Sequence, residues 1–245
     1  MADHDSRAGR RYADGRILEW LDGLHAPHDA GLAAAFDAPA KEHMPAIQVG
    51  KSEGKFLELF LAIARAKKVV EVGTLAGYSA IRIARALPPG GKLWTIEFSP
   101  RHAEVARGAI AAAGLSKKVE VLVGAGLDVL PTLNRHGPFD AVFVDADKGN
   151  YDGYGRWASK HLRPGGLLLG DNAYYFGKLL DDHPEAAAMR RFHEEATKAF
   201  DTVCIPTPDG MLLGVKRGVS RAKAPAAPRR RPAGRSRARG SARRG

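Results

Sequence analysis

Short apolar runs alternate with longer stretches of helical spacing through the middle of the chain. Five apolar or β-branched runs predict buried strands at residues 69–74, 92–97, 118–124, 139–145 and 166–170. The stretches between them predict helices at residues 79–87, 101–113, 125–134 and 151–161. Strands that alternate with helices indicate right-handed crossovers and a mostly parallel sheet, so the pattern predicts an α/β fold.

The pattern changes on either side of this region. Before the first strand, helices are predicted at residues 16–24, 30–36 and 53–66. After the last parallel strand, a helix at 185–197 precedes two strands at 200–205 and 211–215, which flank a Pro- and Gly-containing loop and predict an antiparallel hairpin. We therefore expect an N-terminal helical segment at residues 1–44, a main domain at 45–217 and a separate tail at 218–245.

The basic charge of the chain is concentrated in that tail. The chain has 245 residues and a formal net charge of +11, but residues 216–245 hold twelve of its 38 Lys and Arg residues and no Asp or Glu. The remainder is nearly neutral, with 26 basic and 27 acidic side chains. From about Ser220 onward, Ala, Pro, Gly and Arg dominate without apolar periodicity, which predicts disorder. Such a tail is either a polyanion-binding arm or a solvated extension without a partner.

Cysteine content and the first residues bear on the compartment. Cys204 is the only cysteine, which excludes an internal disulfide framework and fits a reducing compartment. The first residues are polar and mixed in charge, without the apolar core of a secretory signal. No apolar run is long enough to span a bilayer. We therefore expect a cytoplasmic protein.

The first two predicted strands end in residues suited to binding a nucleoside. Gly73 and Gly77 allow a tight turn that a ligand can approach closely. Glu97 ends the second strand, where a carboxylate can hydrogen-bond both ribose hydroxyls. The turn is not the GxGxxG of dinucleotide enzymes and lacks the basic residues of a pyrophosphate cradle. A nucleoside without phosphates, such as S-adenosylmethionine, fits better, while each feature alone is equally compatible with an ordinary βα turn.

Polar oxygens cluster where the fourth and fifth predicted strands end. The fourth ends in Asp145-Ala-Asp147-Lys148 and the fifth in Asp171-Asn172. Buried carboxylates without partners are costly, so packing does not explain this cluster. Oxygen ligands without His or Cys favour Mg²⁺, Ca²⁺ or Mn²⁺ over zinc. The alternative, helix N-capping, accounts for Asp147 and Asp171 but not for the whole set.

Several stretches together carry a family resemblance that extends from about Pro45 to Val215. They are Glu53-Gly-Lys-Phe-Leu, Glu71-Val-Gly-Thr-Leu-Ala-Gly-Tyr-Ser79, Asp145-Ala-Asp-Lys-Gly-Asn-Tyr-Asp-Gly-Tyr154, Arg163-Pro-Gly-Gly, Asp171-Asn172 and Asp209-Gly210. In content and spacing they resemble the cation-dependent O-methyltransferases typified by caffeoyl-CoA and catechol O-methyltransferases, which form bacterial O-methyltransferase family 3.

The resemblance implies a Rossmann-like class I methyltransferase fold, with a seven-stranded, mostly parallel sheet between helices, and a homodimer in which the N-terminal segment is a substrate lid. It implies S-adenosyl-L-methionine and a divalent cation as cofactors. It assigns the cation to Asp145, Asp171 and Asn172, and the role of general base to Lys148. It assigns the methyl donor to Val49, Glu71, Gly73, Ser79, Glu97, Gly126, Asp147 and Tyr154. Gly126 stands where relatives commonly have Ala, but its contact with the adenine is expected through the backbone.

The expected reaction is methyl transfer to a hydroxyl of a catechol-type or vicinal-dihydroxy small molecule. A divalent ion that grips two adjacent oxygens orients the acceptor and acidifies its hydroxyl. A cation beside Lys148 disfavours the ammonium form, so this side chain can take the proton. After Asn172 the chain departs from plant members, with Tyr174-Tyr175-Phe176. These aromatic residues either wall a flat phenolic ring or pack the loop.

Two other functions remain open. Some bacterial relatives are thought to methylate a hydroxylated uridine in tRNA, and the basic tail at 216–245 would then contact phosphates. A third interpretation is a non-catalytic protein that binds an adenosyl ligand. The full set of Asp145, Lys148, Asp171 and Asn172 argues against it.

Overall fold

The computed structural model describes residues 4–7 and 14–218. Within them, seven strands form one mixed sheet in the order β3-β2-β1-β4-β5-β7-β6. The strands are β1 (Lys68–Val72), β2 (Lys92–Glu97), β3 (Val119–Val123), β4 (Phe139–Val144), β5 (Leu162–Gly170), β6 (Phe200–Ile205) and β7 (Met211–Lys216). The first five pair in parallel, and β7 lies antiparallel to both β5 and β6. This confirms the predicted fold class, including the terminal antiparallel hairpin.

Helices precede and connect these strands. Before β1 come α1 (His4–Arg7), α2 (Gly15–His25), α3 (Ala30–Lys41) and α4 (Lys51–Ile63). Between strands lie α5 (Tyr78–Ala86), α6 (Pro100–Ala112), α7 (Gly126–Val129) with the 3₁₀ helix η1 (Leu130–His136), η2 (Lys148–Asn150) with α8 (Tyr151–His161), and α9 (Pro184–Ala199).

Three predicted elements differ from the observed ones. The helix expected at 125–134 is a single turn, α7, followed by η1, because Pro131 has no amide hydrogen to donate to the preceding turn. The α3 helix continues past its expected end at Phe36 and contains Pro39. The β5 strand begins at Leu162 because Leu162 pairs with Phe139 across a register shift.

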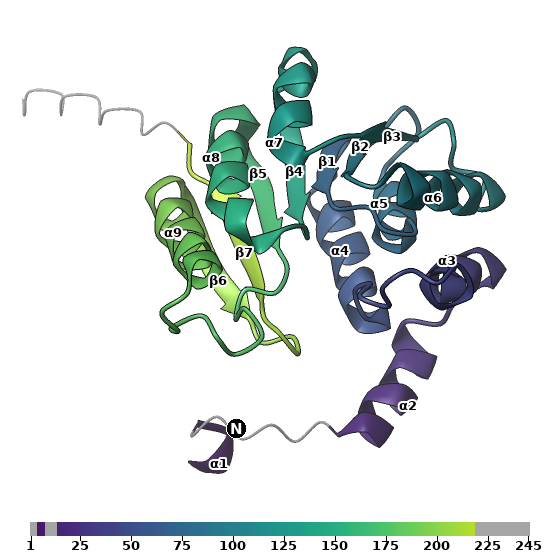
Figure 1. Ribbon diagram of the computed structural model, residues 1–245, viewed down its shortest axis with the longest axis horizontal. Coiled ribbons are helices and arrows are strands. Elements are labelled where there is room, and N and C mark those ends of the chain that lie inside the picture. The colour runs from purple at the N-terminus through teal and green to yellow at the C-terminus, as the bar shows by residue number, and fades with distance from the viewer. Residues whose placement is uncertain (1–3, 8–13, 219–245) are drawn as a thin grey trace, which may run out of the picture.

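Two hydrophobic clusters fill the space between the sheet and its helices. One cluster joins α3, α4, α5 and α6 to the sheet and includes Phe143. The other joins η1, α8 and α9 to the opposite face and includes Val142. Val142 and Phe143 are successive strand residues, and successive strand side chains point to opposite faces. Helices therefore cover the sheet on both sides (Figure 1).

The α2 helix extends away from this body (Figure 1). It buries no residue, and four of its apolar side chains are exposed, those of Ile17, Leu18, Trp20 and Leu24. No helix within residues 4–7 and 14–218 combines the length and apolar character needed to cross a membrane.

The direction of the strands determines where a ligand and the tail can lie. Because β1, β2 and β4 are parallel, their carboxyl ends meet at one edge of the sheet. The β7 strand runs the other way, so the chain passes Lys216 at the opposite edge. Residues 219–245 lie outside the described part of the chain, and the predictions of a disordered, polyanion-binding tail fall largely there.

Candidate active site

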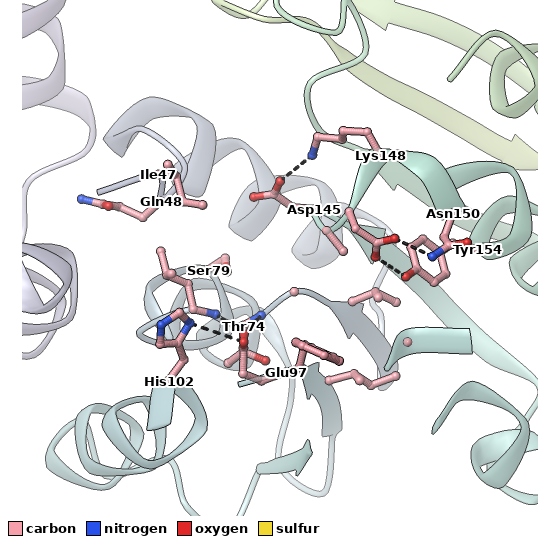
Figure 2. A pocket seen from close by; sticks show the side chains of 18 of the residues that line it. Ile47, Gln48, Thr74, Ser79, Glu97, His102, Asp145, Lys148, Asn150 and Tyr154 are labelled. Carbon is pink, nitrogen blue, oxygen red and sulfur yellow. Dashed lines mark hydrogen bonds and ion pairs between the residues drawn. The ribbon is translucent and has the colours of Figure 1, made fainter. Parts of the chain in front are cut away.

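A pocket of about 820 Å³ opens at the edge where β1, β2 and β4 end. The loops that follow these strands form most of its wall, and residues 45–49, between α3 and α4, close it from the outside. In Figure 2, Asp145 and Lys148 lie at one end of the pocket, and Glu97 and His102 lie at the other. This is the place that the parallel-sheet topology favours for a ligand.

Ten of the residues predicted for the site line this pocket. They are Val49, Gly73, Ser79, Glu97, Gly126, Asp145, Asp147, Lys148, Tyr154 and Asn172. The remaining two, Glu71 and Asp171, are 0% and 5% exposed and lie behind the wall. The structure thus brings together residues from five separate loops, and it buries two carboxylates beneath them.

Gly73 forms the turn after β1 at a position that no other residue can occupy. Its φ is +97°, and a β-carbon there would lie 1.8 Å from the carbonyl oxygen of Asp145. The ends of β1 and β4 therefore approach each other backbone to backbone. This contact places the nucleoside turn and the acidic loop side by side.

Glu97 is held rigidly at the carboxyl end of β2. Its Oε2 accepts hydrogen bonds from the amides of Thr74 and Leu75, at 3.2 and 2.8 Å, and its Oε1 accepts one from the amide of Ser99 at 3.0 Å. The carboxylate therefore organises the turn after β1 as well as its own loop. A carboxylate in this position can still accept further hydrogen bonds from ribose hydroxyls, since each oxygen has two lone pairs.

Asp147 and Tyr154 form a second preorganised pair. The Tyr154 hydroxyl donates to Asp147 Oδ1 at 2.5 Å, and Asn150 Nδ2 donates to Oδ2 at 2.5 Å. Asp147 makes no capping bond to the backbone of η2, so the N-cap interpretation does not describe it. A β-carbon on Gly126 would lie 2.8 Å from Cε1 of Tyr154. Gly126 thus gives the Tyr154 ring the space that it occupies.

Lys148 lies at the acidic end of the pocket and is held on two sides. Its Nζ lies 3.3 Å from Oδ1 of Asp145 and donates to the hydroxyl of Tyr151 at 2.8 Å. The Tyr151 hydroxyl in turn lies 3.2 Å from the carbonyl of Val144 and 3.1 Å from that of Asp171. Tyr151 is fully buried, so it anchors the lysine to the ends of β4 and β5.

The two acids at this end are electrostatically strained. Burial, the Asp145 carboxylate and Glu53 raise the pKa of Asp171 to about 8. Burial also raises the pKa of Asp145, and Lys148 opposes this effect. Asp171 Oδ1 is buried without a hydrogen-bond partner. Such an orphaned oxygen beside a second carboxylate fits a site that a cation completes.

No group of three or more His, Cys, Asp or Glu residues in the described chain is arranged to hold a metal ion. The predicted set has two carboxylates and one amide, that of Asn172. Asn172 has a φ of 52°, in the left-handed region, so the turn after β5 aims its side chain into the pocket. The metal assignment therefore stays a prediction.

Glu71 lies beneath the nucleoside turn. Its Oε2 accepts from the Thr95 hydroxyl at 2.6 Å, and burial raises the pKa of Glu71 to about 8, against the opposing effect of the Ser79 and Thr95 hydroxyls. Because Glu71 is fully buried, it supports the turn from below and has no open surface toward the pocket.

The aromatic run after Asn172 divides between the two interpretations. Phe176 lines the pocket and is 62% exposed. Tyr174 packs its ring against Gly210, and Tyr175 is buried and donates its hydroxyl to Glu185 at 2.6 Å. Phe176 can therefore wall a ligand, while its two neighbours pack the loop.

Sequence reasoning missed several residues of the pocket. His102 lies 3.5 Å from Glu97 Oε1, Asn150 bonds Asp147, and Gln48 lines the outer wall. The rule that ligands lie beyond the carboxyl ends of parallel strands was a usable signal for His102, which lies in the first turn of α6. Nothing local marks Tyr151 as the anchor of Lys148.

Comparison with known proteins agrees with this geometry. The O-methyltransferase family matches residues 28–217. The chain belongs to this family. The described part of the family match contains the whole pocket, from residues 45–49 to Phe176.

Relatives of this O-methyltransferase include two bacterial catechol O-methyltransferases. The protein from Niastella koreensis is 41% identical over 81% of this chain and 96% of its own length. The protein from Mycobacterium tuberculosis is 44% identical over 70% of this chain and 79% of its own length. Caffeoyl-CoA O-methyltransferases of plants are more distant, as in Zea mays at 33% identity over 71% of this chain and 72% of the relative.

Solved structures give the same result. An O-methyltransferase of tomaymycin synthesis from Streptomyces achromogenes, in complex with SAM, has a TM-score of 0.79 and 38% identity, and covers 83% of this chain and 96% of its own. An O-methyltransferase from Bacillus cereus, in complex with SAH, has a TM-score of 0.79 and 34% identity, over 82% and 97%.

Proposed function

We propose that this O-methyltransferase transfers the methyl group of S-adenosyl-L-methionine to one hydroxyl of a catechol-type or vicinal-dihydroxy small molecule, with a divalent cation as cofactor. The observation that carries the proposal is one pocket with a nucleoside-type end at Glu97 and an acidic end with Lys148. The SAM- and SAH-bound relatives support the donor, and the catechol O-methyltransferases among its relatives support the acceptor class.

At the donor end, we assign binding to residues already held in position. Glu97 would accept the ribose hydroxyls, and the backbone of the turn at Gly73 would receive the amino acid portion. Val49, Ser79, Gly126, Asp147 and Tyr154 complete the wall, with Glu71 behind it. Preorganised hydrogen bonds reduce the entropy lost on binding.

At the acidic end, Asp145, Asp171 and Asn172 would hold the cation, through oxygen atoms only. The orphaned oxygen of Asp171 and its repulsion from Asp145 are the features that support this choice. When bound, the cation would orient two adjacent acceptor oxygens and lower the pKa of the reacting hydroxyl.

Lys148 would receive the hydroxyl proton. Its Nζ is 3.3 Å from Asp145, so it lies next to the acceptor's proposed position. Asp145 and Tyr151 restrict the side chain, which keeps Nζ within reach of that position. As a neutral amine Lys148 accepts the proton, and the in-line displacement at the methyl carbon follows.

The mouth of the pocket favours a flat, apolar acceptor. Ile47 and Phe176 line the pocket and are 72% and 62% exposed. Exposed apolar side chains at the rim of a pocket are a common feature of small-molecule sites.

The decisive experiment is a methyl-transfer assay with S-adenosylmethionine and catechol, with Mg²⁺ or with EDTA. We expect activity with Mg²⁺ and none with EDTA; activity that EDTA leaves intact rules out the cation. Lys148→Met should lower the rate about 100-fold or more, while the exposed α8 residue Lys160, changed to Met, should behave as wild type. A non-catalytic adenosyl-binding protein would show no turnover in any of these assays.

Two finer expectations stay predictions. Methylation of a hydroxylated tRNA uridine is supported only by the basic charge of residues 216–245. If it holds, tRNA affinity falls steeply with salt and is lost when 219–245 are deleted. A homodimer is supported by the apolar side chains that α2 leaves exposed, and sedimentation would measure it.

A further inference from the structure

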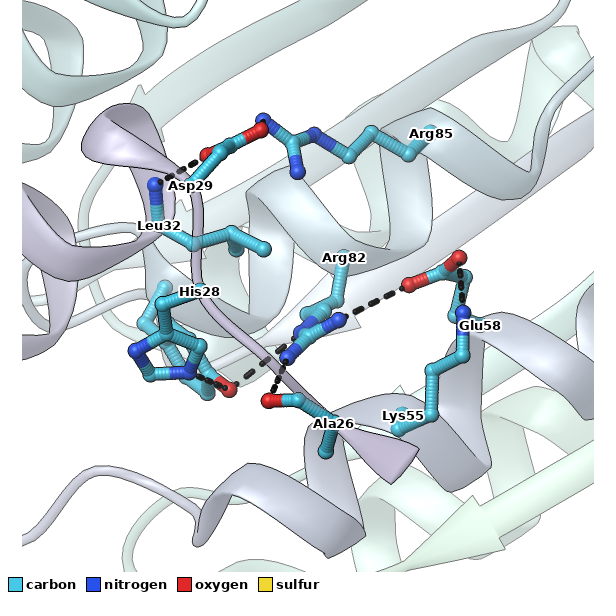
Figure 3. A network of polar contacts seen from close by, with 9 residues as sticks. Ala26, His28, Asp29, Leu32, Lys55, Glu58, Arg82 and Arg85 are labelled. Atoms are coloured by element: carbon cyan, nitrogen blue, oxygen red, sulfur yellow. Dashed lines mark hydrogen bonds and ion pairs between the residues drawn. The ribbon is translucent and has the colours of Figure 1, made fainter. Parts of the chain in front are cut away.

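We propose that His28, Tyr78 and Arg82, here called the N-terminal latch, position the outer wall of the donor pocket and release that wall when His28 gains a proton. This inference rests on the proposed binding of S-adenosylmethionine in the pocket. It assigns a role to residues that line a second, polar cavity of about 360 Å³ beneath the N-terminal helices (Figure 3).

The latch joins three separate parts of the chain. His28, in the turn before α3, places Nε2 2.9 Å from the hydroxyl of Tyr78, the first residue of α5. Arg82 donates to the same hydroxyl at 3.2 Å, to Glu58 of α4 at 3.1 Å and to the carbonyl of Ala26 at 3.5 Å. Arg82 is 3% exposed, so these bonds are shielded from water.

The latch is connected to the pocket on both sides. Tyr78 itself lines the pocket and directly precedes Ser79. Phe36 of α3 packs its ring against those of His28 and Tyr78, with centroids 5.1 and 5.0 Å apart. The carbonyl of Phe36 accepts a hydrogen bond from Gln48 of the outer wall at 2.9 Å. A shift of His28 is therefore passed through α3 to residues 45–49.

Gly54 of α4 accommodates the latch. A β-carbon there would lie 2.9 Å from Cε1 of Tyr78 and 3.2 Å from Cγ of Arg82. The glycine of the Glu53-Gly54-Lys55 motif thus lets Tyr78 and Arg82 reach the turn at His28.

The hydrogen bonds have one consistent direction. Arg82 can only donate, so it donates to the Tyr78 oxygen, and the Tyr78 hydroxyl is then free to donate to His28 Nε2. That last bond requires a neutral imidazole with its proton on Nδ1. If Nε2 carries a proton, two donors meet the Tyr78 oxygen and the phenolic hydrogen loses its acceptor.

The surroundings of His28 also favour its neutral form. Burial lowers the pKa of His28 below its ordinary value, and the cations of Arg82 (α5) and Lys51 (α4) act in the same direction. Asp37 of α3 and Asp22 of α2 oppose them with smaller effects. Since the pKa is lowered in the latched state, latching is complete above the ordinary value of about 6.5 and weakens as the pH falls below it.

The test measures the Kd of S-adenosylhomocysteine by calorimetry between pH 5 and 8. Three variants are compared with wild type: His28→Ala, His28→Gln, and the exposed neighbour His25→Ala as a matched control. Glutamine accepts from Tyr78 and does not titrate, so His28→Gln should bind tightly at every pH. Wild type and His25→Ala should lose roughly five- to tenfold in affinity toward pH 5, and His28→Ala should be weak throughout by the same factor.

A positioning role also predicts that His28→Ala raises KM for S-adenosylmethionine and leaves kcat at saturation nearly unchanged. Parallel pH curves for wild type and His28→Gln would overturn the latch. Absence of ligand binding in wild type would instead overturn the proposed function. Hydrogen exchange on wild type alone, which needs no variant, should accelerate in residues 26–49 at pH 5.5 relative to α6; equal acceleration in both would also count against the latch.

Discussion

The two ends of the pocket satisfy their polar groups in opposite ways. At the donor end, Glu97 accepts three backbone amides and Asp147 accepts two side chains. At the acidic end, Asp171 keeps an oxygen without a partner, and its pKa is raised to about 8 beside Asp145. One end is complete within the protein, whereas the other gains from an added positive charge. The donor end should therefore be sensitive to shape and the acidic end to charge.

The largest effect should come from the charge of the acidic end. Asp171→Asn removes a proposed cation ligand, and we expect methyl transfer to fall about 1,000-fold. The same change removes a strained buried carboxylate, so the cation-free protein should unfold at an equal or higher temperature. Assays in Mg²⁺ and thermal unfolding in EDTA measure the two quantities. Lower stability together with unchanged activity would contradict the contrast between the ends.

The next largest effect should come from the shape of the donor end. Gly73→Ala places a β-carbon against the Asp145 carbonyl at a positive φ, so we expect a loss of about 3 kcal/mol or more in the free energy of unfolding. Gly108 of α6 has nothing within 4 Å of such a β-carbon. Gly108→Ala should therefore stabilise the protein by up to about 1 kcal/mol. Denaturant unfolding of both variants tests this, and similar values for the two would refute it.

A smaller effect concerns Glu71, which is buried at the donor end. Its pKa is raised to about 8, so folding favours its protonated form. Stability from this group is complete below the unfolded pKa of about 4.3 and is lost as the pH rises through 8, at up to about 1.4 kcal/mol per pH unit. Glu71→Gln should flatten the fall in Tm between pH 5 and 8. The exposed Glu104, changed to Gln, should leave the slope as in wild type.

The smallest effect is expected at Gly126. Gly126→Ala would push the ring of Tyr154 from its place and loosen its bond to Asp147. Since the backbone contact with the donor remains, affinity for S-adenosylhomocysteine should fall only about threefold, the equivalent of a fraction of one hydrogen bond. Calorimetry measures this, and a loss of about 100-fold would mean that Tyr154 contributes far more than its hydroxyl.

Much of the fold was predictable from local pattern. The strands at 92–97 and 200–205 and the helix at 151–161 lie where the apolar spacing placed them. The pattern failed where a distant partner decides the outcome. Leu162 belongs to β5 because it pairs with Phe139, and no local feature of residues 162–165 indicates this.

The site was predictable to a different extent. The alternation of strands and helices brings the strand ends to one edge, so the motifs at Gly73, Glu97 and Asp145 were expected to meet. Their depth was not predictable. Glu71 and Asp171 lie beneath the pocket wall, and Tyr151 anchors Lys148 from a buried position.

By itself, the sequence determined the order of strands and helices, the residue types at the strand ends and the family. Periodicity and turn chemistry are local, and a short window of residues carries them. The tertiary structure alone decided which oxygens remain without partners and which residues join across the chain. His28 and Tyr78 are fifty residues apart, and only the packing of α3 against α5 brings their polar atoms within 2.9 Å. Burial and electrostatic coupling depend on that packing, so they become visible only once the chain is folded.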